Sequence, residues 1–155
     1  MEFFPEIQKI KYEGPDTAND LAFRYYNPDE VVAGRPMKDH LKFAMSYWHT
    51  LCAEGTDMFG AGTEDKSFGG SDPMEIARNR VLAGFEFMHK LGIEYFCFHD
   101  KDIAPEGASL REFQANLDAI VPLIKEQMQK YGIKLLWGTA NLFNHPRYVH
   151  GAGTT

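Results

Sequence analysis

The sequence predicts an α/β protein in which parallel strands alternate with helices. Three short apolar segments, rich in aromatic and β-branched residues, are typical of buried strands and span residues 43–50, 93–98 and 133–139. Long segments with apolar residues at helical spacing separate the second strand from its neighbours. The order strand, long loop, helix, strand, helix, strand implies parallel strands joined by right-handed crossovers.

The first helix is expected to begin after Asp72. Asp72 is a suitable N-cap, Pro73 fits the first helical position, and Glu75 lies three residues after the cap. Gly92 is a typical C-terminal stop signal. Between these signals, an apolar stripe expected to face the core consists of Ala77, Val81, Phe85 and Met88.

The second helix has the same signals at its two ends. Ser109 is the expected N-cap, Glu112 follows three residues later, and Gly132 marks the end. Pro122 removes a backbone donor inside this helix, which predicts a kink near residues 118–122. The apolar stripe of this helix consists of Phe113, Leu117, Ile120, Ile124 and Met128.

Residues 1–40 are expected to form an N-terminal extension arm. Prolines and glycines are spaced so that no long helix fits between them. The arm also carries many aromatic side chains, which predicts that it packs on something. The body of the protein and a neighbouring subunit both remain open as the surface that receives it.

Composition excludes several classes of function. The chain has 155 residues, 44% of them hydrophobic and 25% charged, which is typical of a single globular domain and not of a disordered segment. The net charge of −6 and the absence of a basic cluster argue against nucleic acid or an anionic membrane as partners. No apolar run approaches the roughly 20 residues of a membrane span.

The start of the chain lacks a secretory signal pattern, so a cytoplasmic location is expected. The two cysteines, Cys52 and Cys97, both lie in apolar surroundings. Buried reduced thiols are therefore expected, in preference to a disulfide or a metal pair.

Ionisable residues gather where the second predicted strand ends. The apolar segment 93–98 is followed at once by the run His99-Asp-Lys-Asp102, and Pro105 and Gly107 then predict a loop. In proteins with parallel strands, the carboxyl ends of the strands are where sites are built. The sequence therefore predicts a site here, although His-x-x-Asp by itself is a weak motif that more often marks a structural histidine held by a loop carboxylate.

Several motifs in colinear order resemble the xylose isomerase family, in its longer class with an N-terminal extension. The strongest are Tyr47-Trp-His-Thr50, Phe98-His-Asp-Lys-Asp102 and Leu135-Leu-Trp-Gly-Thr-Ala-Asn-Leu-Phe143, and Asp57-Met-Phe-Gly60 and Pro105-Glu-Gly107 also match. The resemblance covers the whole chain and implies a (β/α)8 TIM barrel. This chain would supply the arm and, in residues 41–155, the first three strands of an incomplete barrel.

The same resemblance implies an activity and its partners. Such proteins interconvert D-xylose and D-xylulose, and also glucose and fructose, through metal-assisted hydride transfer. Two divalent cations (Mg, Mn or Co) are implied, with ligands on later strands, so no metal ligand is expected in this chain. The implied partners are a sugar and either a homotetramer or a complementary C-terminal chain.

Two alternatives stay open beside the isomerase. The chain could be a catalytically inactive fragment or assembly element that needs the missing C-terminal part to form a site. It could also belong to another barrel that acts on sugars or sugar phosphates, although no arginine placed after the strands supports phosphate binding.

The resemblance implies roles for seven residues. His99 and Asp102 match the histidine–aspartate pair that opens the sugar ring, while Asp100 and Lys101 are expected to be structural. The implied sugar-binding residues are Trp48, Trp137 and Phe143 as aromatic walls, Thr139 as a partner of a sugar hydroxyl, and Phe59 as a residue inserted into a neighbouring subunit's site. Core packing at strand ends, or anchoring of a loop, is the alternative for each of these five.

Overall fold

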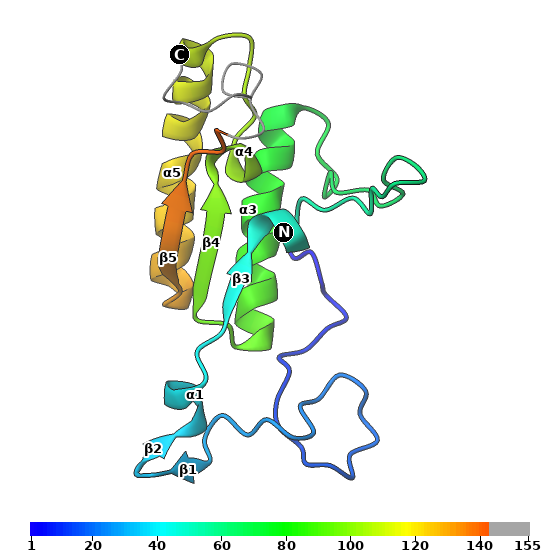
Figure 1. Ribbon diagram of the computed structural model, residues 1–155, viewed down its shortest axis with the longest axis vertical. Helices are drawn as coiled ribbons and strands as arrows, with labels where there is room; N and C mark the ends of the chain where they lie inside the picture. The colour runs from blue at the N-terminus through cyan, green and yellow to red at the C-terminus, as the bar shows by residue number, and fades with distance from the viewer. Residues whose placement is uncertain (143–155) are drawn as a thin grey trace.

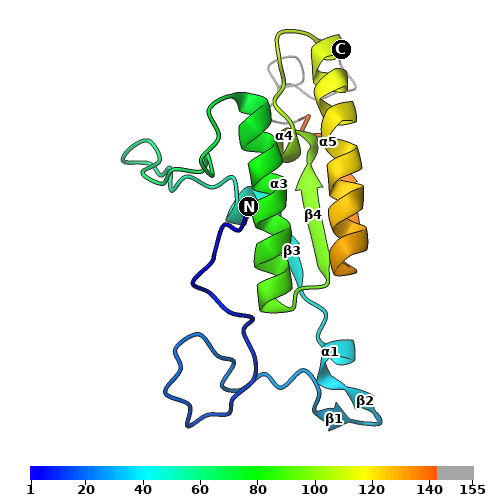
Figure 2. The ribbon, with the colours of Figure 1, turned by 180° about the vertical axis from the view of Figure 1, so that it is seen from behind.

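The computed structural model describes residues 1–142 and contains a three-stranded parallel sheet backed by two long helices (Figure 1). The strand order is β3 (Ala44–Ser46), β4 (Tyr95–His99) and β5 (Lys134–Thr139). Helices α3 (Pro73–Leu91) and α5 (Leu110–Tyr131) cover the same face of this sheet, as the reverse view shows (Figure 2). The predicted alternation of parallel strands and helices is confirmed, and the described residues form an open sheet, not a closed barrel.

Helix α3 begins and ends where the sequence predicts. The Asp72 carboxylate accepts the N–H groups of Met74 and Glu75, both at 2.9 Å. Gly92 ends the helix in the left-handed conformation with φ of 71°, where glycine is the favoured residue. All four residues of the expected apolar stripe are buried: Ala77, Val81, Phe85 and Met88.

Helix α5 follows the same rules. The Ser109 hydroxyl accepts the N–H of Glu112 at 3.2 Å, and the Glu112 carboxylate reaches back to the N–H of Ala108 at 2.8 Å. Gly132 ends the helix with φ of 69°. The helix continues across Pro122 as one element, and the kink expected there stays a prediction.

The core lies between the sheet and its two helices. At its centre, the ring centroids of Phe85 from α3 and Phe96 from β4 are 5.2 Å apart, and the two ring planes make an angle of 67°. Cys97 is buried and donates to the carbonyl of Met45 at 3.7 Å, so its thiol links β4 to β3. Both cysteines are free thiols, as expected, although Cys52 is only partly buried.

The first predicted strand is shorter than residues 43–50. Its second half is a helical turn, α2 (Tyr47–Thr50), that directly follows β3. Tyr47 and Leu51, four residues apart, are both buried and pack beside Gly84 of α3, where a Cβ atom would meet them at 2.7 and 2.6 Å. The long-range packing of these two side chains therefore overrides the strand propensity of the segment.

The arm contains short elements only: β1 (Val31–Val32), β2 (Arg35–Pro36) and α1 (Met37–His40). Its first ten residues lie along α3, where the N–H of Ile10 donates to the carbonyl of Lys90 at 2.8 Å. At least this part of the arm packs on the body of the chain. None of the described helices combines the length and the apolar run that crossing a membrane requires.

Candidate active site

The carboxyl ends of the three strands of the sheet meet at one edge (Figure 1). The candidate residues lie at this edge. His99 is the last residue of β4, and Thr139 lies opposite it in register at the end of β5. Trp137 lies two residues earlier on β5, and Trp48 lies in the turn that follows β3. Four of the seven residues named from the sequence come together at this edge through three different strands, and Asp102 joins them as described next.

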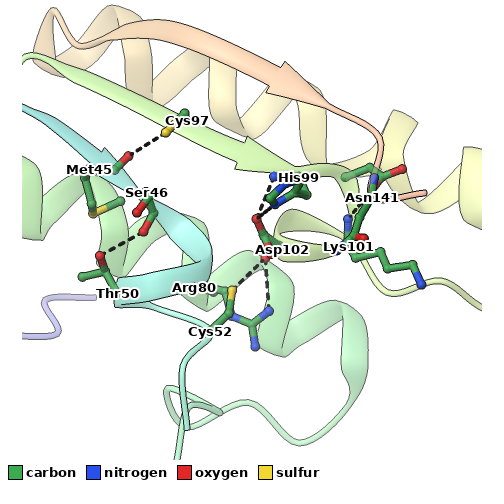
Figure 3. Close-up of polar contacts among 11 residues, drawn as sticks. Met45, Ser46, Thr50, Cys52, Arg80, Cys97, His99, Lys101, Asp102 and Asn141 are labelled. Atoms are coloured by element: carbon green, nitrogen blue, oxygen red, sulfur yellow. Dashed lines mark hydrogen bonds and ion pairs between the residues drawn. The ribbon is translucent and has the colours of Figure 1, made fainter. Parts of the chain in front are cut away.

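The His99–Asp102 pair is formed by a helical turn and not by the loop expected from the sequence. Helix α4 (Asp100–Ile103) begins directly after His99, so Asp102 is its third residue. Its carboxylate oxygen Oδ2 accepts the backbone N–H of His99 at 2.7 Å and lies 3.3 Å from the Nδ1 atom of the imidazole (Figure 3). A carboxylate at the third position that reaches back to the cap residue stabilises a helix start, and here it also faces the ring.

The contact between His99 and Asp102 is largely shielded from solvent. Asp102 is 7% exposed, and the side chain of His99 is only partly exposed. A carboxylate beside one ring nitrogen fixes the orientation of an imidazole, as in other oriented histidine bases. Imidazole is also the side chain best suited to exchange protons near neutral pH. The arrangement can therefore present an oriented proton carrier at the edge of the sheet.

Two tryptophans pack against the imidazole and against each other. The ring centroid of His99 lies 4.7 Å from that of Trp48 and 5.6 Å from that of Trp137, and the two indoles are 5.3 Å apart. Trp48 is half-buried, whereas Trp137 is 39% exposed. Such aromatic faces suit the C–H surface of an apolar or carbohydrate ligand.

The main chain of Asp102 is held by two side chains that the sequence analysis did not assign to the site. Its carbonyl oxygen accepts hydrogen bonds from Arg80 Nη1 at 3.1 Å and from Cys52 Sγ at 3.6 Å (Figure 3). Burial raises the pKa of Cys52 to about 11, so the group remains a thiol and a donor at neutral pH. The signal for Arg80 is its position on α3, three residues after Ala77 and four residues before Gly84. This spacing places it on the side of the helix that faces the core.

Asp100 and Lys101 have structural contacts, as expected. Asp100 Oδ1 accepts the N–H groups of Lys101 and Asn141, both at 2.9 Å. The Lys101 ammonium lies 3.1 Å from a carboxylate oxygen of Glu106. The contact with Asn141 was not predicted, because it joins segments 41 residues apart.

One sugar-binding candidate of the described residues, Phe59, does not join this cluster. Phe59 is 89% exposed on the loop between α2 and α3, which extends away from the sheet (Figure 1). Asp57 shapes the loop tip, because its carboxylate accepts the N–H of Phe59 at 2.7 Å. Phe59 thus does not anchor the loop on its own chain. Phe143 lies outside the described residues.

The described part of the chain does not fit a metal centre. Within residues 1–142, no group of three or more His, Cys, Asp or Glu side chains is arranged to hold a metal ion. The carboxylate of Asp102 is directed at His99, and that of Asp100 at main-chain N–H groups.

The fold and the site define an α/β protein of the parallel-strand class whose candidate catalytic histidine lies at the carboxyl ends of its strands. Curated proteins named xylose isomerase match it along its length: the one from Listeria welshimeri is 57% identical over 155 residues, that from Thermotoga maritima 59% over 155 residues, and that from Tetragenococcus halophilus 54% over 155 residues. These matches cover 99–100% of the chain but only 35–36% of each relative. No protein-family model matches.

The chain therefore matches the N-terminal portion of proteins named xylose isomerase along its whole length. It spans about a third of the length of the curated relatives it matches.

Proposed function

We propose that the chain is the N-terminal portion of an aldose–ketose isomerase that converts D-xylose to D-xylulose and also acts on glucose and fructose. Its contribution is the ring-opening pair, His99 and Asp102, together with part of the sugar pocket. The observation that carries the proposal is the oriented imidazole, 3.3 Å from a buried carboxylate and in contact with two indoles.

Ring opening requires one proton to change position. When the bond between the anomeric carbon and the ring oxygen breaks, the anomeric hydroxyl loses a proton and the ring oxygen gains one. The His99 imidazole can carry this proton, so the protein ends the step in the state in which it began. The Asp102 carboxylate holds the ring in place and stabilises the imidazolium while it exists.

The aromatic residues complete the proposed pocket. Trp48 and Trp137 bind the C–H face of the sugar and keep water from the reacting carbons. Thr139, opposite His99 in register, binds a sugar hydroxyl. Phe143 forms a further wall, and Phe59, exposed at its loop tip, enters the site of a neighbouring subunit in a homotetramer.

Two divalent cations (Mg, Mn or Co) belong to the complete isomerase in this proposal. Their ligands would come from the C-terminal portion, because the described residues hold no suitable group. The hydride transfer between adjacent carbons therefore lies outside the chemistry of these residues.

The second candidate function is an inactive assembly element that needs the C-terminal portion to form a site. The open sheet favours it, because every residue of β5 is exposed. The test is an assay of the purified chain with xylose and Mg²⁺, with and without the C-terminal portion. Turnover by the chain alone would exclude this candidate.

Replacement of His99 tests the catalytic role. In the complete protein, H99Q should lower kcat/KM for cyclic xylose by roughly 100- to 10,000-fold, the range of general acid–base catalysis. An aldose analogue that lacks the ring-closing hydroxyls should lose much less, because it needs no ring opening. H49Q, which changes an exposed histidine of the same region, is the control. Equal losses for both substrates in H99Q would contradict the ring-opening role.

A further inference from the structure

We infer that Arg80 is a positioning residue for the His99–Asp102 pair; this inference rests on the function proposed above. Arg80 lies on α3, outside the run of ionisable residues that forms the pair. Its guanidinium reaches α4 and donates from Nη1 to the carbonyl oxygen of Asp102 at 3.1 Å (Figure 3).

Asp102 is thereby held at two separate atoms. Its Oδ2 atom faces His99, at 2.7 Å from the backbone nitrogen and 3.3 Å from Nδ1. Its carbonyl oxygen is held from the opposite side by Arg80. A carboxylate keeps an imidazole in one orientation only if its own backbone is held in place. The hydrogen bond from Arg80 to the Asp102 carbonyl therefore helps to set the position of the Asp102 carboxylate relative to the His99 ring.

Helix α4 needs such support because it is a single turn of four residues. One turn of helix has no stability of its own in water. The other donor to the Asp102 carbonyl is the Cys52 thiol at 3.6 Å, which is a weak donor. A charged guanidinium makes a stronger bond to an oxygen than a neutral donor does, so Arg80 is the main fastening of this turn to α3.

The placement of Arg80 differs from that of a solvated surface arginine. Its Nε atom is buried and has no hydrogen-bond partner among the described residues. Leaving a buried polar atom unpaired is unfavourable, and such atoms call for an explanation. Arg78, two positions earlier on the same helix, is exposed and supplies a matched control.

The competing explanation is that Arg80 only joins α3 to α4. Both explanations predict lower stability when Arg80 is replaced, so the experiment must read the state of the imidazole. In the complete protein with ¹⁵N- and ¹³C-labelled histidine, the His99 ring signals are assigned by their absence in H99Q. Two replacements, R80M and R80Q, each remove the guanidinium that reaches Asp102. Two variants are used so that a folding defect in one of them does not decide the result.

Each variant is compared with R78A and D102N at a temperature where it is folded. We expect R80M and R80Q to move the His99 ring signals in the direction seen in D102N, and to lower kcat/KM for cyclic xylose by roughly 10- to 100-fold, as small misplacements of catalytic groups do. The ring-less aldose should be affected much less. R78A should leave both measurements unchanged.

Unchanged His99 signals in a folded R80M or R80Q protein, with D102N shifted, would overturn the positioning role and leave the proposed function standing. Unchanged signals in D102N itself would instead remove the His99–Asp102 pair, and with it the ring-opening proposal.

Discussion

The carboxylate of Asp100 accepts a hydrogen bond from the backbone N–H of Asn141 at 2.9 Å. Asp100 is the first residue after β4, and Asn141 is the second residue after β5. The contact joins the carboxyl ends of neighbouring strands just beyond the paired residues His99 and Thr139. It therefore holds the two sides of the candidate site in register.

Loss of this contact should loosen the end of β5. D100A removes the acceptor for the Asn141 N–H, and a hydrogen bond to a charged group contributes roughly 1.5–3 kcal/mol to stability. We expect faster amide exchange at Asn141 and a lower free energy of unfolding, measured by hydrogen exchange and chemical denaturation. D100N keeps a carbonyl acceptor and should retain most of the protection. Equal exchange in wild type and D100A would show that the bond contributes nothing.

The arm should leave α3 at acidic pH. The buried Glu86 carboxylate accepts the N–H groups of Phe3 at 2.7 Å and Phe4 at 2.9 Å, and lies 2.8 Å from the Lys90 ammonium. Burial alone would raise the pKa of Glu86, but these contacts outweigh it and hold the pKa below its ordinary value of 4.5. Because the pKa is lower in the folded state, the stabilisation is present above about 4.5 and is lost as pH falls through the folded value.

Amide exchange at Phe3 and Phe4 measures this release. In the wild type, the protection of these two amides should decrease at pH values below the ordinary pKa of the Glu86 carboxyl. In E86Q, which lacks the titrating group, protection should be weaker at neutral pH and should no longer depend on acid. E13Q alters an exposed arm carboxylate and should behave as the wild type. If acid still releases the arm in E86Q, a titrating group other than Glu86 is responsible.

Gly84 should not tolerate alanine, although it lies inside a helix. Alanine normally stabilises a helix interior relative to glycine by about 0.5–1 kcal/mol. Here, however, its Cβ would lie 2.6 Å from Leu51 Cδ1 and 2.7 Å from Tyr47 Oη, both on buried side chains. Overpacking of this kind costs roughly 1–3 kcal/mol, so G84A should destabilise the chain. Thermal unfolding of wild type and G84A measures whether the replacement lowers or raises the stability of the chain.

The matched control is G60A, because a Cβ at Gly60 meets nothing within 4 Å. A stabilised G84A protein would mean that Tyr47 and Leu51 can move at little cost.

The isolated chain should associate through β5. Leu135 is 41% exposed, Leu136 56% and Trp137 39%, which leaves a row of large apolar side chains at an open sheet edge. Exposed edges and apolar patches promote association. We expect sedimentation to show oligomers, and Trp137 emission in W48F to shift to the blue when the C-terminal portion is added. A monomer that unfolds cooperatively would contradict this prediction.

Local signals predicted the helices well. Each of the two long helices, α3 and α5, has a capping side chain, an apolar stripe and a terminating glycine, and these short-range features act wherever the segment is placed. The second half of the first predicted strand failed because Tyr47 and Leu51 are buried against α3, which lies more than 20 residues further along the chain.

The candidate site was only partly predictable. The spacing of His99 and Asp102 was visible in the sequence, because both belong to one short segment. Arg80 and Asn141 were not identified, since their contacts cross 22 and 41 residues of chain. Trp48 and Trp137 were named through family resemblance, and their packing against one imidazole and against each other required the coordinates.

The sequence by itself determined the order of the three sheet strands and the two long helices, the ends of those two helices, and the position of a histidine and an aspartate at the end of the central strand. Short-range sterics and backbone hydrogen bonding decide these features, and they depend on neighbouring residues only. The tertiary structure alone decided that the residues after His99 form a helical turn, that an arginine from another helix holds this turn, and that two indoles pack against the ring. These features arise from packing between distant segments, which the order of residues does not reveal.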